Sequence, residues 1–342
     1  RPFRLVAARE DGRGLLVRAR TVVAAPGGYD ASLLFAGNDR PGVYTAEGAI
    51  ADSPSPTDPP FRKAVVVGAG ARATELLDRF GASVEAIVAP GPVGPDLARR
   101  ASELGVELYP RSLILRAVGG RRVRGLELAH RGAGETFQLT CDAVVLAHRR
   151  LPNSQLHFQA GARMHWRAET GAYYPVLPDG VATTVPGLFA VGESAGFVGP
   201  AALESAQRAA DTILGVAGST GAPSRVEEAG PHELEGYYRE LLGRPGGIPK
   251  TVACPCEDVL LKDIAQASQR GYRGIEVVKR YTSLGAGLCQ GRYCLPDALL
   301  LLSIWEGRPP PEVGYIRQRP PVVPVALGTL AQLPGPGPPG AS

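Results

Sequence analysis

The chain has 342 residues, enough for two or three domains, and its 44% apolar and 20% charged residues are typical of a soluble globular protein. Its net charge of +4 is spread along the chain, so we expect no nucleic-acid partner. No apolar run approaches the roughly 18–20 residues that span a membrane, and no signal-like segment opens the chain. We therefore expect a cytoplasmic protein. The first residue is Arg1 and not Met, which predicts a fragment or a processed product.

Residues 1–60 begin with short strand-like runs at 15–18 and 21–25, and a turn-rich stretch at 52–60 predicts a crossing between domains. Residues 61–150 then alternate apolar strand-like runs with helical patterns. This alternation predicts a doubly wound, Rossmann-like α/β domain.

Residues 151–217 return to a strand at 187–192 and then to a helix at 201–214. Residues 218–248 are predicted to be a linker with one short helix, and residues 249–306 a small helical domain that carries four cysteines. Residues 307–342 form a proline-rich tail that we expect to be extended.

A dinucleotide-binding motif follows the first strand of the central segment. Gly68-Ala-Gly70-Ala-Arg-Ala73 has the pattern G-x-G-x-x-A, in which small residues let a pyrophosphate approach the amides of a helix N-terminus. An acidic residue about 20 positions later normally binds the adenosine ribose. Here the second strand ends in Val88-Ala-Pro90 without a carboxylate. The sequence therefore favours a Rossmann fold and weighs against NAD(P) binding.

Four cysteines lie near the C-terminus, as Cys254-Pro-Cys256 and Cys289-Gln-Gly-Arg-Tyr-Cys294. Four thiolates can ligate an iron–sulfur cluster. Structural zinc and two disulfides are the alternatives, but the C-x-C pair is too tight for an ordinary disulfide and differs from the usual C-x₂₋₄-C of zinc sites. The fifth cysteine, Cys141, stands in an apolar run and is predicted to be a buried core thiol.

Several segments resemble the pyridine nucleotide-disulfide oxidoreductase class. Thr184 to Gly196 is similar to its late FAD motif, with Glu193 where Asp is usual, and the segment at 21–30 is similar to the end of its FAD domain, with Pro26 where Thr is usual. The resemblance implies that the residue 193 carboxylate binds flavin ribityl hydroxyls and that the next helix directs its N-terminus at the flavin ring. On this pattern a first G-x-G-x-x-G unit is missing before residue 21.

The cysteine block resembles the [2Fe–2S] domain of bacterioferritin-associated ferredoxin. Together with the FAD-type segments, it makes the chain similar to the larger flavin subunit of heteromeric amine dehydrogenases, which includes opine oxidase, proline or hydroxyproline dehydrogenase, hydrogen cyanide synthase and sarcosine oxidase α-type proteins. The resemblance implies a hetero-oligomer with a second flavoprotein subunit of amine-oxidase type, an amine or amino-acid substrate, and electron transfer through the cluster.

This resemblance names the segments as the remainder of an FAD-binding domain (1–60), an NAD(P)-type domain (61–150), a return to the FAD-binding domain (151–217), a linker (218–248) and a [2Fe–2S] domain (249–306). The alternative is a non-catalytic electron-transfer or scaffold subunit that binds only the cluster. No catalytic acid or base is identified. The implied cofactor residues are Gly27, Gly192, Glu193, Gly199 and Ala201 for FAD, Gly68, Gly70 and Ala73 for a dinucleotide, and Cys254, Cys256, Cys289 and Cys294 for iron.

Overall fold

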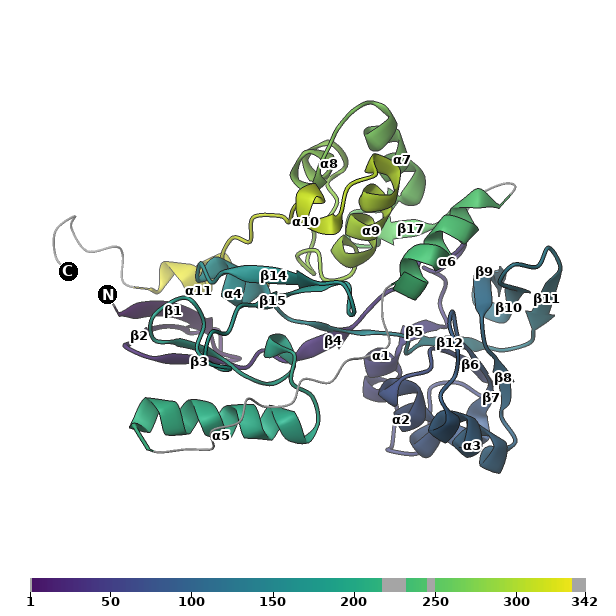
Figure 1. The fold of residues 1–342 in the computed structure, drawn as a ribbon, viewed down its shortest axis with the longest axis horizontal. Helices are drawn as coiled ribbons and strands as arrows, with labels where there is room; N and C mark the ends of the chain where they lie inside the picture. The colour runs from purple at the N-terminus through teal and green to yellow at the C-terminus, as the bar shows by residue number, and fades with distance from the viewer. Residues whose placement is uncertain (1, 217–231, 245–249, 334–342) are drawn as a thin grey trace.

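A five-stranded parallel sheet forms one end of the molecule (Figure 1). The computed structural model describes residues 2–216, 232–244 and 250–333. The sheet has the order β5 (Val43–Thr45), β12 (Ala143–Leu146), β6 (Ala64–Val67), β7 (Val84–Val88) and β8 (Glu107–Tyr109). One face is covered by α1 (Ala46–Ala51), α2 (Ala71–Phe80) and α3 (Pro95–Leu104), and a short 3₁₀ turn spans Gly81–Ser83.

The other face is covered by a three-stranded antiparallel sheet, β9 (Ser112–Gly119), β10 (Val123–His130) and β11 (Thr136–Leu139). All four side chains of β6 are apolar and buried, and successive side chains of a strand point to opposite faces. Both faces of the sheet must therefore be covered. Val65 and Val67 pack toward the antiparallel sheet, and Val66 packs toward α2. The predicted α/β class is confirmed, but an antiparallel sheet replaces the second helical layer of a doubly wound domain.

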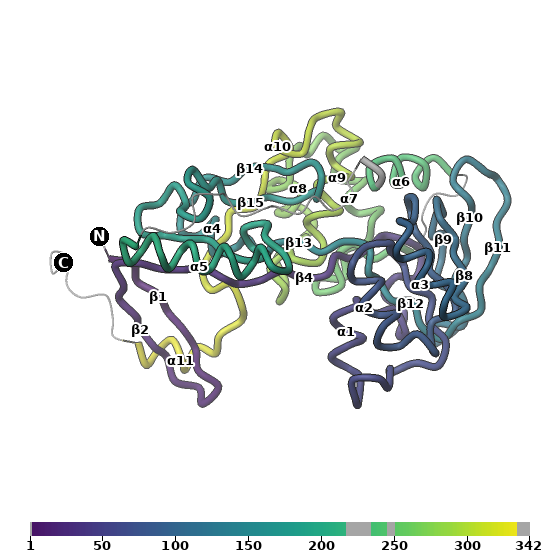
Figure 2. Tube along the Cα trace, turned by 60° about the horizontal axis from the view of Figure 1, so that its bottom comes forward, coloured from purple at the N-terminus to yellow at the C-terminus, as the bar shows by residue number. Residues whose placement is uncertain are grey.

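Short strand pairs form the other end of the molecule, where distant segments of the chain meet. β3 (Val22–Ala24) runs parallel to β16 (Leu188–Ala190), and β4 (Gly28–Asp30) runs antiparallel to β13 (Arg150–Pro152). Two hairpins pair β1 (Phe3–Ala8) with β2 (Gly14–Ala19) and β14 (Met164–Arg167) with β15 (Ala172–Pro175). The helical elements are α4 (Gln155–Gln159), a 3₁₀ turn at Gly192–Ala195 and α5 (Pro200–Leu214), which lies alongside these strands (Figure 2).

The cysteine-bearing segment is a compact group of helices that packs onto the central sheet. It contains β17 (Val252–Cys254), β18 (Val259–Leu260), α7 (Leu261–Gln269), α8 (Ile275–Thr282) and α9 (Leu295–Glu306), and α6 (His232–Gly243) lies against it. Helix α9 is buried on nearly all sides, including Leu299 to Leu302. One continuous core joins this group, α6, and the faces of both sheets.

The tail folds back on the molecule. Residues 307–333 contain α10 (Pro310–Val313) and α11 (Leu327–Ala331), so this part of the predicted extended tail is partly helical. The ring of Tyr315 stacks on Phe158 with centroids 4.4 Å apart, and Thr329 Oγ1 donates to the Gly12 carbonyl at 2.8 Å. Residues 217–231 and 245–249, which include most of the predicted linker at 218–248, and the last nine residues lie outside the described residues. Within the described part of the chain, no helix is long and apolar enough to cross a membrane.

The glycine-rich turn after β6 yields a test of the fold. Gly68 has a φ of +142°, and a Cβ placed on it would lie 2.3 Å from the Ala147 carbonyl oxygen. A Cβ on Gly70 would meet no atom within 4 Å. We expect Gly68→Ala to lower the free energy of unfolding by about 3 kcal/mol, because both strain and overlap result, and Gly70→Ala to lower it by less than about 1 kcal/mol. Urea denaturation measures both values, and equal losses would contradict the arrangement.

Candidate functional site

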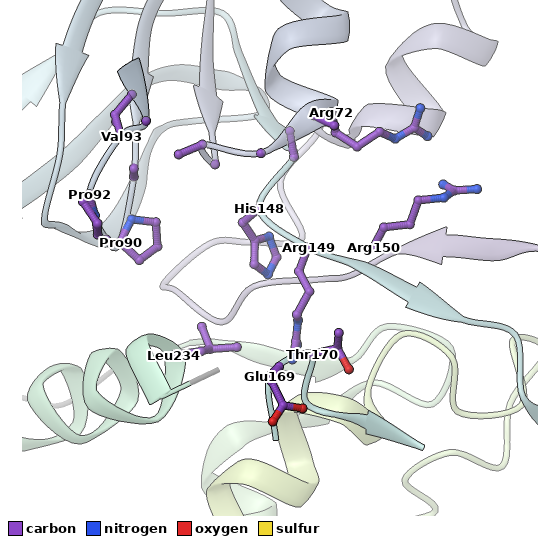
Figure 3. Close-up of a pocket in the computed structure, with 18 residues that line it drawn as sticks. Arg72, Pro90, Pro92, Val93, His148, Arg149, Arg150, Glu169, Thr170 and Leu234 are labelled. Atoms are coloured by element: carbon purple, nitrogen blue, oxygen red, sulfur yellow. The ribbon is translucent and has the colours of Figure 1, made fainter. Parts of the chain in front are cut away.

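A cavity of about 420 Å³ opens at the carboxyl ends of β6, β7 and β12 (Figure 3). This edge of a parallel sheet is the usual place for a ligand in α/β proteins. The loop that contains Gly68 and Gly70 forms one wall, and Gly70 is the N-cap of α2. Ala73, the third position of the motif, is buried inside α2 and does not line the cavity.

The second wall carries no ribose-binding carboxylate. After β7 the lining continues with Ala89, Pro90 and the next four residues, and Ala89 uses its own amide and carbonyl in bonds to Tyr109 and Ser112. Among the described residues that line the cavity, Glu169 at the β14–β15 turn is the only acid. The residues at the end of β7 therefore do not fit the usual clamp for an NAD adenosine ribose.

The third wall contains two residues that the sequence analysis did not predict, His148 and Arg149. Neither ring nitrogen of His148 has a hydrogen-bond partner, and the same holds for Nε and Nη1 of Arg149, although all four atoms are buried. Burial, reinforced by the charge of Arg149, lowers the pKa of His148 to about 3. His148 is therefore a neutral imidazole at neutral pH.

Arg149 is held by a buried ion pair with the cysteine-bearing segment. Its Nη2 donates to Asp297 Oδ1 at 3.0 Å, and only 8% of the arginine side chain and 1% of the aspartate side chain are exposed. Ser32 Oγ donates to the other oxygen of Asp297 at 2.9 Å. Asp297 lies one helical turn after Cys294, so the cavity and the cysteines share this contact.

The predicted flavin residues meet at the junction of β3, β4, β13 and β16. Glu193 follows β16 as expected, and Gly27 and Gly28 lie next to its Oε2. Arg150 binds both carboxylate oxygens, with its Nε 2.6 Å from Oε1 and its Nη2 3.0 Å from Oε2. Arg150 therefore engages one acceptor position on each oxygen of Glu193, and the carboxylate can still accept a hydrogen bond from a ribityl hydroxyl.

The remaining flavin positions surround little free space. Gly192 donates its amide to Ser205 Oγ at 3.0 Å, Gly199 is the N-cap of α5, and Ala201 is buried in the first turn of that helix. The cavity between Arg150, Arg167, Tyr174 and Glu193 measures about 30 Å³. The roles assigned to Gly27, Gly192, Glu193, Gly199 and Ala201 stay predictions.

The four predicted iron ligands lie together as two thiol pairs. The Cys254 and Cys294 side chains are hydrogen-bonded to each other, and so are those of Cys256 and Cys289. Cys254 and Cys294 are buried, Cys289 is half-buried and Cys256 is exposed. The hydrogen bond from Cys294 lowers the pKa of Cys254 to about 6, whereas that bond and burial raise the pKa of Cys294.

Backbone amides also point at these sulfurs. Three amides, those of Gly285, Glu257 and Cys256, donate to the Cys254 sulfur, and those of Tyr293 and Gly291 donate to the Cys289 sulfur. A Cβ on Gly287 would lie 2.3 Å from the Cys256 Cβ, so only glycine allows this close approach. Thiols surrounded by amide donors fit the ligand set of an iron–sulfur cluster.

The arrangement differs from a site for one metal ion. Among the described residues, no group of three or more His, Cys, Asp or Glu side chains converges on a single ion. Cys141 lies apart, buried beneath the central sheet, and burial raises the pKa of its thiol to about 12. Arg292, between the two last cysteines, is half-buried and donates from Nε to Gln155 Oε1 at 3.1 Å.

The parallel sheet with a glycine-rich crevice at its carboxyl edge defines an α/β fold of the dinucleotide-binding type. Residues 4–212 match the Pyridine nucleotide-disulphide oxidoreductase family, and this chain belongs to it. The family implies an oxidoreductase with FAD as cofactor. Residues 249–333 match the Sarcosine oxidase A3 domain.

Relatives cover nearly the whole chain. An opine oxidase subunit from Agrobacterium tumefaciens (strain Ach5) is 27% identical over 94% of this chain and 71% of its own length. The alpha subunit of sarcosine oxidase from Rhizobium meliloti (strain 1021) is 30% identical over 91% of this chain but 31% of its own length. The crystal structure of L-proline dehydrogenase from P. horikoshii has the same fold, with a TM-score of 0.69, 24% identity, and coverage of 96% of this chain and 62% of that chain.

The buried histidines predict a pH-dependent stability. Burial lowers the pKa of His148 to about 3 and of His157 to about 4, from ordinary values near 6.5. As the pH falls below 6.5 the unfolded chain binds protons that the folded chain does not, so stability present above pH 6.5 is lost toward pH 4. We expect each histidine to contribute a slope of about 1.4 kcal/mol per pH unit in this range.

Urea denaturation at several pH values measures this slope. His148→Leu is expected to remove its share of it, whereas His130→Gln, at an exposed position that ends β10, serves as the matched control. A slope that His148→Leu leaves unchanged would show that His148 is not buried as a neutral ring.

Proposed function

We propose that this chain is the flavin and iron–sulfur subunit of a heteromeric amine or amino-acid dehydrogenase of opine, proline or hydroxyproline type. Three observations support the proposal: membership of an FAD-dependent oxidoreductase family, relatives named as subunits of opine oxidase and sarcosine oxidase, and the cysteine cluster. The proposed reaction class is oxidation of CH–NH or CH–NH₂ donors. The protein is proposed to act in the cytoplasm.

The pairing of the thiols carries the iron–sulfur part of the proposal. In a [2Fe–2S] cluster each iron takes two of the four thiolates, whereas structural zinc takes all four on one ion. Two thiol pairs, Cys254 with Cys294 and Cys256 with Cys289, match the first pattern. When bound, such a cluster passes on one electron at a time, and the amide donors at Cys254 and Cys289 tune its potential.

Substrate oxidation is assigned to a partner subunit. Relatives of this chain are named as subunits of opine oxidase and of sarcosine oxidase, which supports a division of the reaction between chains. We therefore propose that an amine-oxidase-type flavoprotein subunit takes the hydride and that this chain receives the electrons. The cluster then lies on the route from a two-electron donor to a one-electron or external acceptor.

Iron analysis tests the cluster. The chain purified without oxygen should contain about two irons and two inorganic sulfides per polypeptide and, once reduced, the electron paramagnetic resonance signal of a [2Fe–2S] centre. Cys254 belongs to a thiol pair and accepts hydrogen bonds from backbone amides. Cys254→Ser should therefore abolish the signal. Cys141→Ser is the matched control, because this buried thiol takes no part in either thiol pair, and it should keep full iron content. One zinc per chain and no sulfide would refute the proposal.

A second candidate function is an electron-transfer subunit that binds only the cluster. The bidentate contact of Arg150 with Glu193 favours it, because this contact engages both oxygens of the carboxylate expected to bind the flavin. The visible spectrum of the chain before and after heat release of flavin distinguishes the two functions.

Under the first function we expect released flavin, and we expect Glu193→Gln to lower flavin retention about tenfold through the lost charged hydrogen bond. Glu204→Gln, on the exposed side of α5, should leave retention unchanged. A cluster spectrum without any released flavin would establish the second function in place of the first.

A further inference from the structure

We propose that the groove at the amino ends of β6 and β12 is a docking surface for an acidic, extended peptide segment of a partner protein. This groove has a volume of about 840 Å³ and is lined by four arginines, Arg62, Arg121, Arg122 and Arg124. The lining residues Arg62 and Asp142 precede β6 and β12, so the groove lies at the opposite edge of the parallel sheet from the cavity that follows these strands. The inference goes beyond the proposed function and depends on neither flavin nor iron.

The arginines of this groove have no partners within the described chain. Across residues 2–216, 232–244 and 250–333, none of the four arginine side chains forms an ion pair or a hydrogen bond. Arg116 lies on β9, the strand that leads into the turn carrying three of them, and it is by contrast paired with Glu127. Four guanidinium groups therefore remain available to an anion from outside the chain.

Two acids also line the groove, but the arginines outnumber them. Both oxygens of Asp142 accept hydrogen bonds from the backbone amides of Arg62 and Lys63, at 2.9 to 3.2 Å. The Asp142 carboxylate thus holds the chain that leads into β6, and the Lys63 side chain is paired with Glu85. Asp58 is exposed, and its side chain forms no ion pair with the described residues. Four positive charges face two negative ones, so the groove is positive.

The backbone around the groove is held in shape before anything binds. Gly119 has a φ of +148°, and a Cβ on it would lie 2.1 Å from the Arg122 carbonyl oxygen, so only glycine allows this turn. Val123 is buried and donates its amide to the Pro41 carbonyl at 3.0 Å. Another part of the lining is Pro59-Pro60, where the proline rings fix the backbone φ angles. A groove that is formed in advance loses little conformational entropy when a ligand enters it.

The lining residues indicate the class of partner. A guanidinium group binds a carboxylate through two parallel hydrogen bonds, so several neighbouring arginines suit carboxylates that are spaced along an extended chain. Pro59-Pro60 is half-buried and offers apolar surface to the same chain. All four arginines are exposed, which suits a segment bound at the surface and not an enclosed small molecule.

Nucleic acid fits this groove less well than an acidic peptide. Its phosphates form a long, evenly charged backbone, which proteins bind with an extended basic surface. The net charge of the whole chain is only +4, and the arginines of the groove belong to two short segments, at 62 and at 121–124. An acidic peptide needs no longer basic surface than this, and DNA serves as a competing probe in the test.

Fluorescence anisotropy of the full chain with labelled probes tests the proposal. The probes are octaglutamate, a neutral peptide of the same length made of glutamine and serine, and an oligodeoxythymidine of the same net charge as octaglutamate, each carrying fluorescein. At low ionic strength we expect octaglutamate to bind and the neutral peptide not to bind. The affinity for octaglutamate should fall as salt is added, because the contacts join exposed charges.

Two charge-matched variants separate the groove from the overall charge of the chain. The groove variant combines Arg121→Gln, Arg122→Gln and Arg124→Gln. The control variant replaces three exposed arginines that form no ion pair in the described chain, on the β1–β2 hairpin and just before α8, by Arg4→Gln, Arg18→Gln and Arg273→Gln. Since each exposed ion pair contributes modestly, the groove variant should bind octaglutamate about tenfold more weakly. The control variant has the same net charge and should bind as the unchanged chain does.

A third variant is expected to gain affinity, which no folding defect can produce. Asp58→Asn removes the exposed acid of the groove and should tighten octaglutamate binding about threefold. The proposal is supported if the groove variant alone loses binding and Asp58→Asn gains it. It is overturned if octaglutamate does not bind, if the neutral peptide or the oligodeoxythymidine binds at least as tightly, if the groove and control variants lose equal affinity, or if Asp58→Asn leaves the affinity unchanged.

Discussion

The carboxylate of Asp297 is the contact on which the arrangement of this molecule depends. It lies in the interior, 1% exposed, and it accepts hydrogen bonds from Arg149 and Ser32, with a further bond from Tyr238. These three residues come from the strand connection that follows β12, the segment before the central sheet, and α6. A single side chain of the cysteine-bearing segment therefore holds three other parts of the chain in place.

The ion pair between Asp297 and Arg149 fixes the position of α9 more than it stabilises the fold. A buried ion pair offsets its own desolvation only when every polar atom is satisfied, and the loss of one partner costs about 3–5 kcal/mol. The contact fixes how α9 is positioned against the rest of the chain, because Asp297 accepts hydrogen bonds only from groups at fixed positions. The apolar side chains of α9 alone would tolerate small shifts. Burial raises the pKa of Asp297 even though Arg149, Ser32 and Tyr238 all act to lower it. The position of Cys294, one turn earlier, is thereby tied to the cavity at the carboxyl ends of β6, β7 and β12.

The sequence predicted those features that depend on local chemistry. Alternating strands and helices after Ala64 predicted the parallel sheet, and the spacing of the four cysteines predicted residues that the fold does bring together. Contacts between distant segments left no such signal. Arg150 binds Glu193 from 43 positions away, and Arg149 binds Asp297 from 148 positions away, so neither pairing follows from periodicity or motif. The sequence pattern indicated strands in the region of β9 and β10, but not that they pair antiparallel and cover one face of the parallel sheet in place of helices.

Two adjacent arginines connect the two proposed cofactor regions. The chain is extended where β13 begins, so consecutive side chains point to opposite sides. Arg149 turns toward Glu169 and Thr170, and Arg150 turns toward the side of Arg72 (Figure 3). Arg149 binds Asp297, and Arg150 binds Glu193. Two neighbouring residues thus connect Asp297, beside the cysteines, with Glu193 at the predicted flavin position. A shift of this connection would therefore alter the surroundings of Asp297 and of Glu193 together.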